Sequence, residues 1–404
     1  MTPGARVAAA IEVVDRWAAG VPGGPGLDRV LAEWGRRNRY AGSGDRRAVA
    51  DLAYDAVRRL RSALWMGGAG PAELPPTHPA PPGRPALIGS LKLDGADLSA
   101  LFTGQGHAPA QLRKEDAPGV ELSHAPKAVQ LDIPDWLEEH DRLGALPYEA
   151  LDRLRHRATV HLRVNLLKGN ATTGIETLAE DGVAAVPGPL SPTCVTVMEG
   201  ARRVRTSRAY QDGLVEVQDA ASQAVADLCT TTPGMRVLDL CAGAGGKTLA
   251  IAATAQNAVE LVAHDVDERR LAQLPPRAAR AGAKIRCEPN RAALPEGNDL
   301  VLVDAPCSGS GAWARNPDAK WSLTSERLDW LRETQATVLR QAAGFLAPGG
   351  RIVYATCSLM PLENERIVDD FVASTPAFTL NAQYQWTPLD RGDGFFAACL
   401  TAPG

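Results

Sequence analysis

VLDLCAGAGGKT, residues 237–248, leads from an apolar run through three glycines into a second apolar stretch. The run RVLDL (236–240) predicts a buried strand, and LAIAATA (249–255) predicts a helix. Glycines allow a tight turn and close backbone approach to a ligand, and a helix N-terminus favours negative charge. Asp265 ends the next predicted strand, 22 residues after Gly243, where an acid suits the hydroxyls of a ribose. This unit predicts a cofactor site at the carboxyl edge of a sheet.

The chain divides into three predicted regions, and this unit lies in the last of them. Residues 206–404 alternate strand and helix patterns, which indicates an α/β fold with a doubly wound, mostly parallel sheet. Its predicted strands are 236–240, 260–264, 284–287, 299–303, 350–355 and 395–399. Residues 1–126 are predicted to form one helical domain, with helices at 27–37 and 45–64 and a Pro/Gly-rich loop at 67–90. Residues 127–205, with strand patterns at 160–165 and 194–198, are predicted to form a small α+β subdomain.

The glycine loop has four possible interpretations. It could bind one of three kinds of ligand, or it could be a purely structural turn. A phosphate loop needs GxxxxGK[ST], but Cys241 occupies the first glycine position. A dinucleotide loop needs GxGxxG, but Thr248 occupies the third glycine position. S-adenosylmethionine requires a glycine turn and a ribose-binding acid, but no phosphate cradle.

The charge, the apolar runs and the cysteine spacing exclude several classes of protein. Lys and Arg total 43 against 47 Asp and Glu, a net charge of −4, which excludes a uniformly basic nucleic-acid binder but not a local basic face. Glu12 and Asp15 interrupt the apolar run near the start, so no signal peptide is predicted. No apolar run reaches the roughly 18 residues of a membrane span. Seven scattered cysteines without a CxxC pair argue against a zinc ribbon or a disulfide framework. We expect a cytoplasmic protein with no metal site.

Two cysteines stand out because each follows the end of a predicted strand. Cys307 lies in DAPCSGSG (304–311), and Cys357 lies in TCS (356–358). Neighbouring parallel strands are ~4.8 Å apart and ligands bind at their carboxyl ends, so Asp304, both cysteines and the glycine loop should converge. A buried cysteine is usually a small hydrophobe. That is the expectation for the other candidates, Cys194, Cys229, Cys287 and Cys399.

Paired thiols beside a methyl donor suit methylation of cytosine at carbon 5. That carbon is a poor nucleophile until a thiolate adds to carbon 6 and converts the ring to an enamine. Afterwards the carbon 5 proton and the thiolate must both leave, so one hard step is split into easier ones. The attacking sulfur must be ionised, which requires a local environment that favours the thiolate.

Six strings closely resemble the RsmB/Sun family of RNA 5-methylcytosine methyltransferases. They are VQDAASQ (217–223), VLDLCAGAGGKT (237–248), DAPCSGSG (304–311), ARNPDAKW (314–321), YATCSLMPLENE (354–365) and DGFFAACL (393–400). The resemblance implies a Rossmann-like, seven-stranded S-adenosylmethionine-dependent methyltransferase domain at 206–404. It also implies a NusB-like RNA-binding domain at 1–126. LRVNLLKG (162–169) resembles the start of the small subdomain that precedes the catalytic domain.

The resemblance also implies residue roles. Cys357 corresponds to the nucleophile, Cys307 to the cysteine associated with product release, and Asp304 to an aspartate shared by cofactor and target base. The implied cofactor site comprises Cys241, Ala242, Gly243, Ala244, Gly245, Gly246, Lys247, Asp265, Asn290 and Asp304. Lys247 is also expected to reach the active centre. Asn290 departs from the Gly-Asp usual there, and Ala314 replaces a frequent arginine.

Arginine clusters suggest where RNA could bind, since the planar guanidinium suits phosphates. Three groups are candidates: Arg36, Arg37, Arg39, Arg46, Arg47, Arg58, Arg59 and Arg61; Arg153, Arg155, Arg157 and Arg163; and Arg202, Arg203, Arg205 and Arg208. Arginines on helix surfaces are usually only solvated, so the clusters gain weight from flanking an RNA-modifying site.

The leading hypothesis is a monomeric enzyme that methylates carbon 5 of a cytosine in 16S ribosomal RNA or an assembly intermediate, using S-adenosylmethionine. Three alternatives remain. The substrate could be transfer RNA, the chain could be a non-catalytic RNA-binding or ribosome-assembly factor that retains the fold, or Cys307 could be the nucleophile.

Overall fold

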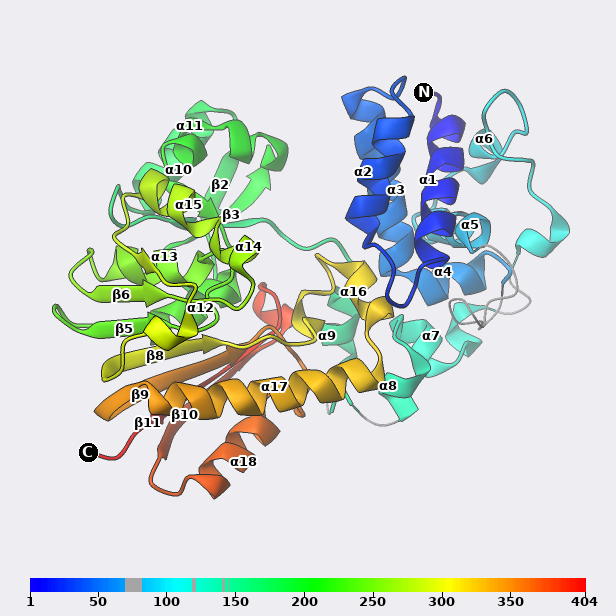
Figure 1. The fold of residues 1–404 in the computed structure, drawn as a ribbon. Coiled ribbons are helices and arrows are strands. Elements are labelled where there is room, and N and C mark those ends of the chain that lie inside the picture. The colour runs from blue at the N-terminus through cyan, green and yellow to red at the C-terminus, as the bar shows by residue number, and fades with distance from the viewer. Residues whose placement is uncertain (70–81, 118–120, 140–141, 145) are drawn as a thin grey trace. The chain divides into compact units, whose positions relative to one another are not determined.

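The computed structural model describes residues 1–69, 82–117, 121–139, 142–144 and 146–404 (Figure 1). The chain divides into two compact units, one formed by Met1–Arg157 with Ala312–Arg327 and the other by Ala158–Gly311 with Leu328–Gly404. The domain boundaries expected at 126 and 205 stay a prediction. Within the described residues, no helix is both long and apolar enough to cross a membrane.

The first unit is helical. Its helices are α1 (Pro3–Ala18), α2 (Leu27–Arg37), α3 (Ser43–Arg58), α4 (Leu60–Met66), α5 (Gly83–Leu93), α6 (Leu98–Leu101), α7 (Lys127–Leu131), α8 (Asp135–Glu139), α9 (Tyr148–Arg153) and α16 (Pro317–Ser322). Trp17, Trp34, Leu64 and Leu87 are buried in a common core. The helix predicted at 27–37 is confirmed, because its apolar positions recur with the helical period and face that core.

Two predictions in this unit were wrong. The helix expected at 45–64 breaks at Arg59, because Asp132 starts a new helix there: its carboxylate accepts hydrogen bonds from the Ser62 amide at 2.8 Å and the Ser62 hydroxyl at 2.7 Å. Residues 83–90 of the expected loop are helical, because Leu87 and Ile88 are fully buried. Residues 70–81 of that loop lie outside the described residues.

The segment 312–327 packs into the helical unit. The Trp321 indole donates to the Val57 carbonyl at 2.8 Å, and the Lys320 ammonium donates to the Arg58 carbonyl at 3.1 Å. Asp318 accepts from the Leu27 amide at 3.0 Å and so caps α2, whose own cap residue is a glycine. Asp318 therefore has a structural partner within its own unit.

The second unit contains a seven-stranded sheet in the order β10-β11-β9-β8-β5-β6-β7. Its strands are β5 (Arg236–Asp239), β6 (Glu260–Ala263), β7 (Arg286–Cys287), β8 (Asn298–Asp304), β9 (Leu346–Thr356), β10 (Thr379–Trp386) and β11 (Phe395–Thr401). The five strands from β9 to β7 are parallel, whereas β11 is antiparallel to both of its neighbours, β9 and β10. The doubly wound α/β class is confirmed. Strand β10 was not predicted, although its sequence TLNAQYQW alternates polar and apolar residues, a pattern that indicates a strand with one solvated face.

Helices cover both faces of this sheet (Figure 1). They are α12 (Ala220–Leu228), α13 (Gly246–Thr254), α14 (Glu268–Leu271), α15 (Leu274–Ala281), α17 (Ser325–Gly344) and α18 (Glu365–Ser374). Val301 and Tyr354 face α17 and α18, whereas their chain neighbours Leu302 and Val353 face α12 and α13. Burial on both faces explains why these strands are continuous apolar runs.

A smaller antiparallel sheet, in the order β2-β3-β1-β4, precedes the large sheet in the chain. Its elements are β1 (His161–Val164), α10 (Ala171–Glu180), β2 (Ala184–Pro187), β3 (Cys194–Glu199), α11 (Arg208–Gln211) and β4 (Val215–Val217). The strands predicted at 160–165 and 194–198 are confirmed. Arg163 was wrongly placed in a basic surface cluster: it is buried, and its guanidinium donates to Gln218 at 2.7 Å.

Candidate active site

The two cysteines singled out by their positions meet at the carboxyl edge of the large sheet. Strands β8 and β9 are parallel neighbours, with Asp304 paired to Ala355 at their ends. Cys307 and Cys357 follow these strands, and their Sγ atoms lie 3.3 Å apart. The Gly311 amide donates to the Cys357 carbonyl at 3.0 Å and joins the two loops.

The contact affects the pKa of Cys307. The pKa of Cys307 lies well above its ordinary value, because it shares a hydrogen bond with Cys357 and because it is buried. Either sulfur can be the donor in this contact.

A lysine–aspartate pair lies in the same unit. Lys247, near the start of α13, donates from Nζ to Oδ2 of Asp304 at 2.8 Å. Burial opposes the charge of Lys247, but Asp304 outweighs it, and with a smaller contribution from Cys357 the pKa of the ammonium is raised. Its Nζ also lies 4.9 Å from the centre of the Phe395 ring. Lys247 is thus a fixed positive charge that interacts with both Asp304 and Cys357.

A buried carboxylate that the sequence analysis missed ties the cysteine loops together. Glu363 is fully buried and accepts from the Ser308 amide at 2.8 Å and from the Ser308 and Ser358 hydroxyls at 2.5 Å each. Gln335 on α17 donates to it at 3.0 Å. Each serine directly follows one of the two cysteines, so Glu363 holds both loops in one arrangement. The only sequence signal was its place in MPLENE (360–365), which would equally suit an exposed residue before a helix.

The glycine loop has the tight conformation that its composition predicts. Gly243 and Gly245 have φ values of 56° and 84°, in the left-handed region that favours glycine. A Cβ on Gly245 would come within 2.2 Å of the Leu274 side chain, so this position also lacks room. The turn leads directly into α13, whose first residue is Gly246. Its N-terminal amides therefore lie at the same sheet edge as the cysteines.

Asp265 is positioned by the glycine loop. Its carboxylate accepts from the Gly243 amide at 2.7 Å and from the Asp267 amide at 2.8 Å. Each oxygen keeps a second lone pair, so the oriented carboxylate could still accept from ribose hydroxyls. A shape-restricted glycine turn beside such an acid fits a ribose-bearing cofactor.

The remaining predicted cofactor residues have different surroundings. Asn290 is exposed after β7, and its side-chain oxygen accepts from the Ala292 amide at 3.1 Å, which leaves its NH₂ group available. Burial raises the pKa of the Cys241 thiol, so it stays neutral, and Ala244 accepts from Arg277 through its carbonyl. The Ala242 amide donates to the His264 carbonyl at 2.8 Å. These loop residues could contribute shape and backbone groups to a ligand.

The other four cysteines are not part of this site. Cys194 and Cys229 are buried, as predicted for core residues. Cys287 and Cys399, in β7 and β11, are half-buried and pack against hydrophobic clusters. Burial raises the pKa of all four thiols, which makes them poor nucleophiles.

Known proteins are similar to this chain over part of its length. Residues 228–400 match the family described as 16S rRNA methyltransferase RsmB/F. The ribosomal RNA small subunit methyltransferase B of Klebsiella pneumoniae is 35% identical over 266 residues, which cover 62% of this chain and 61% of that protein. The counterpart from Salmonella paratyphi C is 33% identical, with 66% of each chain covered. The chain therefore matches about three fifths to two thirds of the length of these relatives.

Solved structures share the fold over more of the chain. The crystal structure of PH0851 has a TM-score of 0.76 and 25% identity, and 99% of each chain is covered. The structure of NSun6 from Pyrococcus horikoshii with SFG has a TM-score of 0.60 and 18% identity, covering 67% of this chain and 98% of that one. At that identity the second similarity concerns the fold alone.

Proposed function

Since this chain belongs, through residues 228–400, to the RsmB/Sun family of methyltransferases, we propose that it methylates carbon 5 of a cytosine in RNA. The methyl donor is S-adenosylmethionine, and the proposed substrate is 16S ribosomal RNA, as the names of the relatives suggest. The observation that carries the proposal is the 3.3 Å separation of Cys307 and Cys357 at the carboxyl edge of the sheet. Two thiols so close can serve successive steps on one base.

In the proposed reaction, the Cys357 thiolate adds to carbon 6 of the cytosine. The new S–C bond pushes electrons to carbon 5, which takes the methyl group from the donor. The Lys247 ammonium favours the thiolate before the attack, and Asp304 stabilises the polar edge of the base. A water molecule then takes the carbon 5 proton, the electrons of that C–H bond restore the ring double bond, and the Cys357 sulfur leaves as a thiolate. Cys307 lies close enough to donate a hydrogen bond to the departing sulfur. The base must be unpaired or flipped out to be reached.

Residues of the glycine loop and Asp265 are proposed to hold the cofactor. S-adenosylmethionine, when bound, supplies the methyl group from its sulfonium sulfur. The loop offers backbone groups where a side chain would clash, and Asp265 offers an oriented carboxylate for the ribose. Asn290 could bond to the adenine edge, although it already accepts one backbone hydrogen bond.

Tritium release tests the reaction at carbon 5. A 16S ribosomal RNA transcript labelled with tritium at carbon 5 of its cytosines is incubated with the protein and S-adenosylmethionine. We expect one tritium released for each methyl group transferred. Methyl transfer without tritium release would place the methyl group elsewhere, and binding of RNA without any transfer would favour the non-catalytic alternative. Bisulfite mapping of the product then identifies the cytosine.

A further inference from the structure

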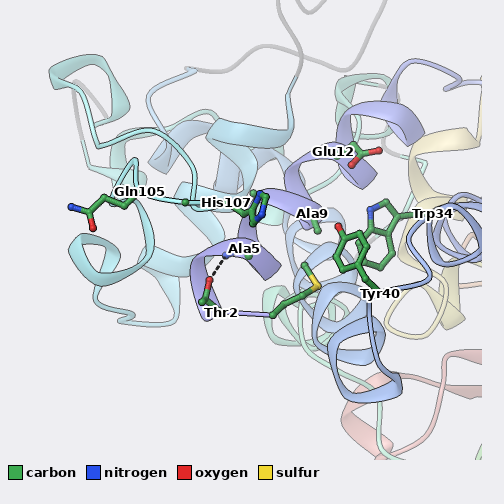
Figure 2. Close-up of a pocket in the computed structure, with 11 residues that line it drawn as sticks. Thr2, Ala5, Ala9, Glu12, Trp34, Tyr40, Gln105 and His107 are labelled. Carbon is green, nitrogen blue, oxygen red and sulfur yellow. Dashed lines mark hydrogen bonds between the residues drawn. The ribbon is translucent and has the colours of Figure 1, made fainter.

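A pocket of about 710 Å³ lies in the helical unit, and none of the residues assigned to catalysis lines it (Figure 2). Small side chains of α1, including Ala5 and Ala9, form part of its lining. Trp34 and Tyr40 line it on one side of α1, and His107 lines it from the loop on the other side. Trp34 is buried, but the Tyr40 ring is 73% exposed. A large aromatic ring left in solvent at the mouth of a pocket suggests a flat ligand.

The chain on either side of Tyr40 carries exposed positive charge. Five of the eight arginines from the first predicted cluster are exposed and make no ion pair with a described residue: Arg36, Arg37, Arg39, Arg46 and Arg47. The prediction of an RNA-binding surface was wrong for the other three arginines. Arg58 and Arg61 are buried, and Arg59 pairs with Asp94 at 2.8 Å. Arg46 and Arg47 line a second, shallow hollow that begins at Ala41, next to Tyr40 in the chain.

Nearby acids do not cancel this charge, because they have partners of their own. Asp45 pairs with Arg6 at 2.9 Å, and Glu12 lies 3.7 Å from Arg16. Glu33 lies 3.8 Å from Arg16. The exposed arginines therefore remain available to an anionic ligand.

We propose that the pocket takes an unpaired nucleobase of the substrate RNA while the neighbouring arginines bind the flanking phosphates. This inference rests on the proposed function, since it assumes an RNA substrate. A base offers a flat face to stack on Tyr40, and Glu12 can accept from an exocyclic amino group. Arginine forks suit phosphate oxygens. An apolar peptide would leave the five arginines unneutralised, which disfavours a protein occupant.

The test compares Tyr40→Ala with Tyr148→Ala, which removes another exposed tyrosine of the same unit that does not line the pocket. Affinity is measured for a 16S ribosomal RNA transcript and for a fully paired RNA duplex. We expect Tyr40→Ala to weaken binding of the transcript about 5- to 150-fold, the range for loss of one stacked base. Duplex affinity and the rate of methyl transfer at saturating transcript should be unchanged, and Tyr148→Ala should match the wild type.

A second variant separates phosphate binding from base binding. Arg46→Gln combined with Arg47→Gln should weaken both RNAs and reduce the dependence of affinity on salt. The proposal that the pocket binds a base would be overturned if Tyr40→Ala bound the transcript with the affinity of the wild type. It would also be overturned if Tyr40→Ala lost as much affinity for the duplex as for the transcript. If the wild-type protein transfers no methyl group, the proposed function fails, but the binding comparison still decides whether the pocket takes a base.

Discussion

The Sγ atoms of Cys307 and Cys357 lie 3.3 Å apart although 50 positions separate the residues in the sequence. Parallel pairing of β8 with β9 brings them together, and Glu363 holds the loops that carry them. Both remain free thiols, so each is available for its own step. The resemblance to the RsmB/Sun family assigns the attack to Cys357, and the raised pKa of Cys307 is in line with a different role for that thiol.

Replacing each cysteine in turn should give opposite results. Cys357→Ala should form no covalent adduct with RNA, because no sulfur attacks carbon 6. Cys307→Ala should accumulate an adduct that resists denaturant, because release is blocked after attack. Gel electrophoresis of protein mixed with labelled RNA and S-adenosylmethionine measures both, and Cys399→Ala, a half-buried cysteine elsewhere in the same unit, is the control. Adduct in Cys357→Ala but none in Cys307→Ala would assign the attack to Cys307.

Glu363→Gln should disturb the active site and stability together. The glutamine presents an NH₂ group to hydroxyl and amide donors that now point at a carboxylate, so a buried polar group loses its partners. We expect the free energy of unfolding to fall by about 1–3 kcal/mol in urea titrations. Below the unfolding transition, kcat should fall more than KM rises, because the cysteine loops shift.

The control for this prediction is Glu333→Gln, which changes an exposed glutamate on α17. It should leave both stability and kcat at the wild-type values. Loss of stability in Glu363→Gln with an unchanged kcat would mean that the carboxylate supports the fold but does not position the cysteines.

Lys247→Met should slow the reaction of Cys357 with iodoacetamide. The ammonium interacts with the sulfur as well as with Asp304, so removing it takes away a positive charge that would attract an anionic sulfur. We expect alkylation about 10-fold slower, the effect of one neighbouring charge, followed by mass spectrometry of the Cys357 peptide. Lys247→Arg should retain most of the wild-type rate, because it keeps the charge. Equal rates in wild type and Lys247→Met would remove Lys247 from the activation of Cys357.

Asp239, at the end of β5, should make stability depend on pH. Burial raises the pKa of its carboxyl from 3.8 to about 7, against the hydrogen bond from Thr248. Between these values the folded state holds a proton that the unfolded chain has released, so the free energy of unfolding should fall as pH rises, by up to about 1.4 kcal/mol per pH unit. Urea titrations at pH 5, 6 and 7 measure this slope.

Asp239→Asn removes the titrating group but keeps an oxygen that can accept from Thr248. The slope between pH 5 and 7 should therefore be smaller in this variant than in the wild type. Asp370→Asn, on the exposed side of α18, should keep the wild-type slope. Identical slopes in Asp239→Asn and the wild type would show that Asp239 is ionised across the range.

The pattern of apolar residues, and the Gly, Pro and Ser residues that interrupt it, were sufficient to predict most of the large sheet. They also predicted the edge of the sheet at which Asp304, Cys307 and Cys357 lie. This worked because buried parallel strands are continuous apolar runs, and because residues that follow adjacent strands must end at one edge. The positive-φ turn at Gly243 and Gly245 was predictable for a similar reason, since few other residues tolerate that conformation.

The features that the sequence did not predict depend on contacts between residues far apart in the chain. Nothing local distinguishes Arg61, which is buried against Asp135, from exposed Arg47, or marks Glu363 as the acceptor for two loops. The break at Arg59 likewise depends on Asp132, some seventy residues later in the chain. A charged side chain is buried only where folding supplies its counter-charge or hydrogen-bond donors, so its role becomes apparent once the packed neighbours are known.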